Sequence, residues 1–120
     1  YGMVLIEAMN FGLPNISTKI FAVPEIVGDT GLLFSSEVSY YGKNYLFKWP
    51  SWETFGNYIK THELQKNVNQ LVEKISLLVE NDSLRKKLGR KSRERLETGK
   101  LSIKNRNEKL KRIYEDAVKA

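Results

Sequence analysis

Hydrophobic positions in the first third of the chain switch between helical and extended spacing. Four apolar residues near the beginning recur at the helical repeat: Val4, Leu5, Ala8 and Met9. Gly12 and Pro14 follow where a helix ends. Residues 15–18 are expected to form a short strand and residues 31–34 a buried one, because turn residues bound the second segment. A proline and a carboxylate favour a short helix over 23–27. The order helix, strand, helix, strand predicts an α/β fold.

The second half of the chain keeps a helical repeat throughout. One apolar stripe predicts a long amphipathic helix, which Thr61 would cap: Leu64, Val68, Leu71, Ile75 and Leu78. The polar run 81–83 interrupts it, and a further helix is expected from Leu84 to a stop at Gly99. Ser102 would cap a last helix. The pattern therefore predicts long C-terminal helices behind few strands.

An aromatic-rich segment lies between the N-terminal α/β pattern and the C-terminal helices. Residues 35–61 hold eight of the thirteen aromatic residues of the chain, which indicates an insert that covers something apolar. Residues 45–49 could add a third strand. Two or three strands are fewer than a doubly wound sheet normally has. Because the chain also lacks an initiating methionine, we expect it to start partway through a domain, and the open sheet edge makes self-association an expectation.

Composition narrows the chemistry. The chain has 120 residues, enough for one domain, with no cysteine and a single histidine, His62. Disulfides, thiolate metal sites, thiol nucleophiles and histidine clusters are thereby excluded, and His62 is expected to be a surface residue. We expect no metal site. No apolar run reaches the roughly 18 residues that span a bilayer, so a cytoplasmic location is expected.

The positive charge is concentrated late in the chain. Between Arg85 and Arg112 there are thirteen Lys and Arg residues against three acidic ones, although the whole chain has a net charge of only +6. Such a segment suits an anionic partner, which could be nucleic acid, an acidic membrane surface or another domain. A solvated helix surface without any partner is the alternative explanation.

The N-terminal motif resembles a known family. Residues 1–9 (YGMVLIEAM), the Gly12-Leu13-Pro14 turn, Thr18 and the segments 24–27 (PEIV) and 31–34 (GLLF) are similar to the donor-binding domain of retaining glycosyltransferases of family 4, which have the GT-B fold. The resemblance is dense through residue 34 and looser from residue 70. It implies a partial Rossmann-like domain with three parts: motif-bearing residues 1–34, the aromatic insert 35–69 and a helical part 70–120.

The resemblance also implies a site for a nucleoside-diphosphate sugar. The backbone N–H groups of Gly2, Met3 and Val4 would hold the diphosphate at a helix start, and Glu7 would accept hydrogen bonds from the ribose hydroxyls. The family's other glutamate would precede Tyr1 by two residues, so no catalytic residue is assigned within this chain. No metal or other cofactor is implied, and the N-terminal acceptor domain lies outside these residues. The fragment alone is expected to bind weakly and to be inactive.

One loop departs from the family pattern. The family usually has two glycines where this chain has Phe21 and Ala22, so the loop from Thr18 to Ala22, near donor or acceptor, is bulkier and less free in φ. A second hypothesis stays open: a non-catalytic basic helical module that binds nucleic acid or an anionic surface through residues 85–112. Of these ligands we expect nucleic acid least. Both hypotheses combine if the basic helices hold the enzyme at the inner face of a membrane.

Overall fold

The computed structural model describes residues 2–38, 49–62 and 64–119. Six helices and two strands occur in these ranges, in an order that begins helix, strand, helix, strand. The elements are α1 (Met3–Asn10), β1 (Ile16–Thr18), α2 (Val23–Val27), β2 (Leu32–Phe34), α3 (Trp52–Thr61), α4 (Gln65–Glu80), α5 (Asp82–Glu97) and α6 (Ile103–Lys119). The α/β class expected from the sequence is therefore confirmed.

The sheet consists of β1 and β2, which pair in parallel with Ile16 opposite Leu32 and Thr18 opposite Phe34. The short helix α2 makes the crossover that a parallel pair requires. Both strands end at the same edge of the sheet, where the loop 19–22 leaves β1. A third strand expected over residues 45–49 falls almost entirely outside the described residues.

Helix α1 ends at a glycine, as the sequence predicts. Gly12 has a φ of 69°, and its N–H donates to the carbonyl of Met9 at 2.9 Å. The next N–H, of Leu13, donates to the carbonyl of Ala8 at 3.0 Å. These two bonds form the Schellman arrangement, in which a left-handed glycine satisfies the last carbonyls of a helix. Pro14 then leads directly into β1.

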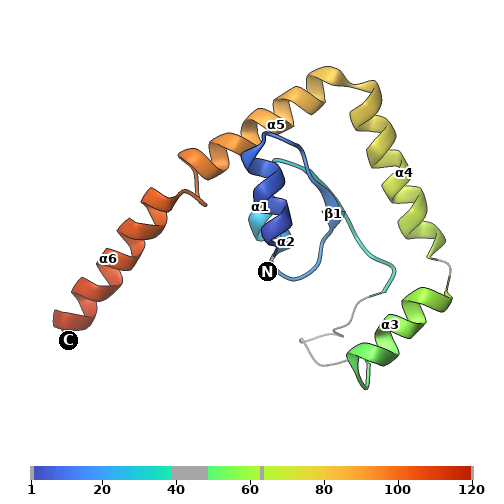
Figure 1. The fold of residues 1–120 in the computed structure, drawn as a ribbon, viewed down its shortest axis with the longest axis horizontal. Helices are drawn as coiled ribbons and strands as arrows, with labels where there is room; N and C mark the ends of the chain where they lie inside the picture. The colour runs from blue at the N-terminus through green and yellow to red at the C-terminus, as the bar shows by residue number, and fades with distance from the viewer. Residues whose placement is uncertain (1, 39–48, 63, 120) are drawn as a thin grey trace.

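Helix α5 lies across the α/β part (Figure 1) and packs against α1. A Cβ atom at Gly89 would collide with the carbonyl oxygen of Gly12, so the two backbones touch at this point. The buried Ser92 of α5 donates its hydroxyl hydrogen to the carbonyl of Thr30 at 3.1 Å. The small apolar core lies beneath this helix and comprises Met9, Val27, Phe34, Leu78 and Leu88.

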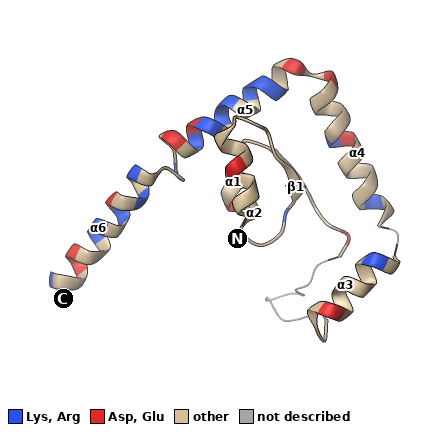
Figure 2. Ribbon diagram, in the orientation of Figure 1, with Lys and Arg blue, Asp and Glu red and all other residues tan. Residues whose placement is uncertain are grey.

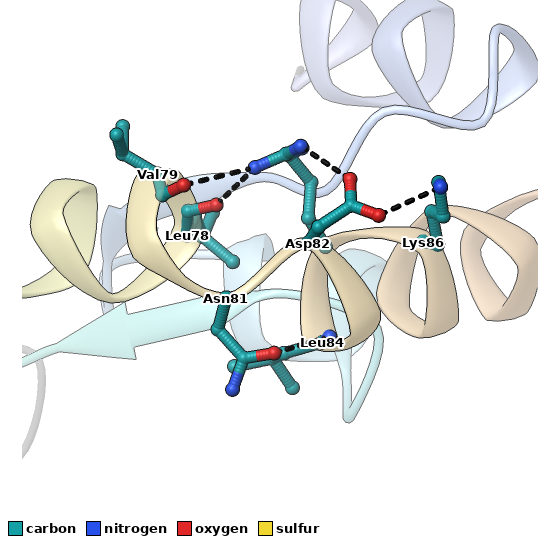
Figure 3. Close-up of polar contacts among 7 residues, drawn as sticks. Leu78, Val79, Asn81, Asp82, Leu84 and Lys86 are labelled. Carbon is teal, nitrogen blue, oxygen red and sulfur yellow. Dashed lines mark hydrogen bonds and ion pairs between the residues drawn. The ribbon is translucent and has the colours of Figure 1, made fainter.

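The junction of α4 and α5 is held by side chains on both sides of the turn (Figure 3). The Asn81 side chain accepts a hydrogen bond from the Leu84 N–H at 2.8 Å, which caps α5. Arg85 donates to the Leu78 carbonyl at 2.6 Å and pairs with Asp82. A break between the helices is confirmed, but it is confined to Asn81: α5 begins at Asp82, two residues before the predicted start at Leu84.

One expectation about helix capping is wrong. Thr61 does not cap α4: it is the last residue of α3, and its hydroxyl donates to the carbonyl of Asn57 at 2.8 Å. The aromatic segment contains the helix α3, which begins at Trp52 behind the cap Ser51. Helix α4 begins at Gln65 and so crosses the boundary predicted at residue 70. By contrast, Ser102 caps α6 as expected, since its hydroxyl accepts from the Asn105 N–H at 3.2 Å.

The apolar stripe of α4 remains largely in contact with solvent. Only Leu78 of this stripe is buried, at 7% exposure, while Val68, Leu71 and Ile75 are exposed. Helix α6 extends away from the sheet (Figure 1), and none of its described residues is buried. The radius of gyration is 17.9 Å, compared with about 14 Å for a compact domain of this length. The helices thus present apolar faces that the described chain does not cover.

Candidate functional site: the start of helix α1

The candidate donor site begins where α1 begins. Gly2 occupies the N-cap position, and its carbonyl accepts from the N–H groups of Leu5 at 3.0 Å and Ile6 at 3.3 Å. No side chain caps the helix. The N–H groups of Met3 and Val4 therefore have no acceptor within α1. Donors of this kind, at the positive end of a helix dipole, suit a phosphate oxygen.

Glu7 lies on the same face as Met3, one turn further along α1. Side chains in a helix lean toward its N-terminus, which brings the Glu7 carboxylate toward the helix start. Glu7 is exposed, as are Met3 and Val4. Within the described part of the chain, no cation forms an ion pair with Glu7. The carboxylate is thus accessible to a ligand at this end of α1.

Packing leaves little room for a side chain at position 2. A Cβ atom there would lie 3.0 Å from Leu5 Cδ1 and 3.1 Å from Ile26 Cδ1. Since the φ of Gly2 is −68°, the constraint is steric and not conformational. Ile26 belongs to α2 and follows Ala22 by one turn, so the start of α1 and the first turn of α2 are neighbours. The structure therefore brings Gly2 close to the helix that the loop 19–22 leads into.

The loop after β1 has an unusual backbone. Phe21 has a φ of 47°, and it is the one residue other than glycine in the described chain with a positive φ. Thr18 ends β1, and Ala22 is the N-cap of α2. The left-handed conformation is one that glycine adopts easily, which is the residue the family resemblance leads us to expect here. The phenyl ring is 62% exposed, so its bulk points away from the core.

Asn15 positions α1 over the sheet, a role that the sequence did not predict. It is buried, its side-chain amide donates to the Leu5 carbonyl at 3.2 Å, and its carbonyl accepts from the Leu32 N–H at 2.8 Å. One residue thereby ties α1 to both strands. An asparagine between Pro14 and a β-branched residue gives little warning of this role, since asparagine is common in turns.

The carboxyl end of β2 is linked to α4 by polar side chains that the sequence analysis did not single out. The Asn67 side chain accepts from the Glu37 N–H at 2.9 Å, and the Glu37 carboxylate accepts from the Asn67 N–H at 3.0 Å. Gln70 donates to the Ser35 carbonyl at 3.0 Å. These contacts attach the insert and α4 to the sheet edge at which the loop 19–22 also lies.

The basic segment is used in part by the fold itself. Arg95 donates to the carbonyls of Ile26 at 2.9 Å and Glu25 at 2.8 Å, at the end of α2. Lys100 lies 3.1 Å from the Glu25 carboxylate. Lys91 lies 2.6 Å from the Asp29 carboxylate. These cations connect α5 and the turn after it to the α/β part, and Glu25, a residue of the motif, has a structural partner.

A shallow depression of about 260 Å³ lies between the last turns of α5, the turn that follows α5 and the turn at Asp29 and Thr30. Its lining includes the cations Lys91, Arg95 and Lys100 and the carboxylates Asp29 and Glu94. The hydrogen bond and the charge of Lys91 hold the pKa of Asp29 below its usual value of 3.8. Three cations thus face two carboxylates in this depression, and Lys91 already pairs with Asp29.

Other charges of the segment face solvent. Lys87, Lys104, Lys109 and Arg112 are exposed and form no ion pair within the described ranges. Along α5, six cations follow one another from Arg85 to Arg93 without an acidic residue between them, whereas acidic residues interrupt the basic ones at the end of α5 and along α6 (Figure 2). The positive charge of the segment is therefore densest in α5 before Glu94.

His62 lies at the surface, as the sequence predicts. His62 is exposed at the end of α3, where its ring stacks on Tyr58 with centroids 3.8 Å apart and its Nδ1 lies 3.0 Å from the Tyr58 carbonyl. The expected surface position is confirmed. No group of three or more metal-ligating side chains occurs in residues 2–38, 49–62 and 64–119. In the same ranges, no helix combines the length and apolarity needed to cross a membrane.

Comparison with known proteins gives no match, whether to a family model, to a curated protein or to a solved structure.

Proposed function

We propose that this chain is part of the nucleotide-sugar-binding domain of a retaining glycosyltransferase. Gly2, Met3 and Val4 would bind the diphosphate through their backbone N–H groups, and Glu7 would bind the ribose. The single observation that carries the proposal is the start of α1, which no side chain caps, with the exposed Glu7 one turn away and without an ion pair among the described residues. The motif resemblance supplies the chemical class of the ligand.

The surrounding architecture supports this assignment. In open parallel sheets, ligands bind beyond the carboxyl ends of the strands, where the following helices begin. Thr18 and Phe34 end their strands at one edge, and four residues separate the end of β1 from the start of α2. The packing of Ile26 of α2 beside Gly2 brings the start of α1 to the helix that begins there. A diphosphate at α1 would thus lie where this class of fold binds nucleotides.

Calorimetric titration tests the donor site. UDP, GDP and ADP are titrated separately into the 120-residue chain, into Glu7→Ala and into the control Glu80→Ala. Glu80 is an exposed acid at the end of α4, so its removal should leave binding unchanged. We expect one nucleotide to bind and Glu7→Ala to weaken it about tenfold or more, corresponding to about 1.4 kcal/mol. Equal affinity for all three proteins, or no binding to the folded chain, would contradict the proposal.

We propose a role at an anionic membrane as a second function. It is favoured by four exposed cations that form no ion pair in the part of the chain that the structure describes: Lys87, Lys104, Lys109 and Arg112. Flotation with neutral vesicles and with vesicles containing acidic lipid distinguishes membrane binding from its absence. Recovery should rise with acidic lipid and fall with added salt, because the attraction is electrostatic. Replacing Lys104, Lys109 and Arg112 together by glutamine should remove that rise, and equal recovery with both vesicle types would exclude the role.

A further inference from the structure

Two exposed aromatic rings meet at the carboxyl edge of the sheet. Phe21, in the loop after β1, and Trp52, the first residue of α3, have ring centroids 6.4 Å apart with an interplanar angle of 48°. Phe21 is 62% exposed and Trp52 is 57% exposed. The contact joins the aromatic insert to the loop beside the candidate donor site, two segments separated by thirty residues of sequence.

The rings are held in place from behind. Trp52 packs edge-on against Phe55 at 6.0 Å, and Trp49 lies 5.6 Å from Phe55 and 4.7 Å from Tyr58. Ser51 fixes the start of α3, because its hydroxyl accepts a hydrogen bond from the Thr54 N–H at 3.1 Å. Trp52 thus stands on a supported helix end, and part of its surface stays in contact with solvent.

The left-handed backbone conformation of Phe21 is a further indication of a functional role. A left-handed conformation costs a residue with a side chain free energy that glycine avoids. The Phe21 side chain nevertheless remains 62% exposed. Residues held in such conformations concentrate at functional sites, so the strain together with the exposure leads to a functional hypothesis.

We propose that Phe21 and Trp52 form a platform for a sugar ring of the acceptor glycan. This inference rests on the proposed function, because a glycosyltransferase must bring the acceptor close to the donor. The negative face of an aromatic ring attracts polarised C–H groups, and one face of a pyranose presents several of them. The exposed Glu53, and the hydroxyls of Ser51 and Thr54, lie in the same first turn of α3 and suit sugar hydroxyls.

The platform is tested by NMR with simple sugars. Methyl β-glucoside and methyl β-galactoside are titrated into the labelled chain, and sorbitol, which has hydroxyls but no ring face, serves as the control ligand. The chain has two tryptophans, so two indole N–H signals report binding, and Trp52→Ala assigns them. Phe21→Gly removes the second ring and relieves the positive φ, which keeps the test informative if Trp52→Ala disturbs α3. Phe11→Ala, a 72% exposed phenylalanine at the other end of α1, is the matched control.

We expect a pyranoside, but not sorbitol, to shift the Trp52 indole signal. Affinity should fall about two- to tenfold in Phe21→Gly and in Trp52→Ala, as for the loss of one aromatic contact, and should be unchanged in Phe11→Ala. An unshifted Trp52 signal with both pyranosides, or equal affinity in all variants, overturns the platform. Nucleotide titration of the same samples separates the two proposals: nucleotide binding without a sugar contact overturns the platform alone, and the reverse result overturns the donor site alone.

Discussion

Phe21 shows how one residue can combine strain and exposure. Two variants that both remove the ring separate the backbone contribution from the side-chain contribution: Phe21→Ala and Phe21→Gly. Because alanine keeps the penalty of a φ of 47° and glycine does not, Phe21→Gly should be more stable than Phe21→Ala by about 1 kcal/mol. Urea denaturation of both variants measures the difference. A Gly variant that is less stable than the Ala variant would contradict the strain.

Two glycines in helices make a matched pair with opposite predictions. Gly89 of α5 touches the backbone of Gly12, whereas a Cβ at Gly56 of α3 would have no neighbour within 4 Å. Gly89→Ala should therefore lower the free energy of unfolding by about 3 kcal/mol, since helix and turn must separate. Gly56→Ala should raise it by about 0.5 to 1 kcal/mol, because alanine is the better helix former. Thermal denaturation compares them, and similar effects of both changes would argue against the contact of α1 and α5.

At the scale of elements, Arg95 joins α5 to the end of α2. Its two donated hydrogen bonds reach carbonyls that the end of α2 leaves open. Arg95→Met keeps the aliphatic stem and should lower the free energy of unfolding by about 1.5 to 3 kcal/mol. The control is Arg90→Met, whose partner Glu94 lies 3.9 Å away on the same exposed face, with an expected change within about 0.5 kcal/mol. Urea denaturation that gives equal losses would rule out this link between the helices.

The pH dependence of stability should reflect two exposed ion pairs. Hydrogen bonding and charge from Lys91 lower the pKa of Asp29, and Lys86, together with Arg85, lowers the pKa of Asp82. A carboxylate with a lowered folded pKa stabilises the fold above its unfolded value of 3.8, and the effect disappears as the pH falls through the folded pKa. Replacing both by asparagine should flatten the decrease in stability below about pH 3.8. Asp116→Asn, an exposed acid without an ion pair in the described residues, should leave the acid limb unchanged.

At the scale of the whole molecule, exposed apolar surface dominates. The stripe on α4 and the outer face of α6 leave Val68, Ile75 and Ile113 in contact with solvent. We expect the isolated chain to self-associate as its concentration rises, because apolar faces of this size are normally covered. Light scattering should detect the association, and Ile75→Glu with Val68→Lys should reduce it. The control change Glu73→Gln on α4 should leave the association unchanged. A monodisperse wild-type monomer at high concentration would contradict the expectation.

Much of the fold follows from local chemistry in the sequence. The left-handed glycine and the proline that end α1, the Ser102 cap and the helical repeat of α4 all act within a few residues, so they could be recognised directly. The aromatic insert was harder, because its residues fit a strand, a loop or a helix equally well. Its helix α3 is defined by the Ser51 cap, and Thr61, chosen as a cap, ends α3 instead.

The candidate site, like the fold, was predictable from the sequence only in part. By itself, the sequence determined the α/β order, the end of α1, the cap of α6, the absence of cysteine chemistry and the motif residues from Gly2 to Glu7, since each depends on residue type and short spacing. Only the tertiary structure decided that Ile26 packs beside Gly2, that Arg95 binds α2 and that Trp52 reaches Phe21. These contacts join residues that are distant in the chain, and their partners depend on how whole elements pack, which no local pattern specifies.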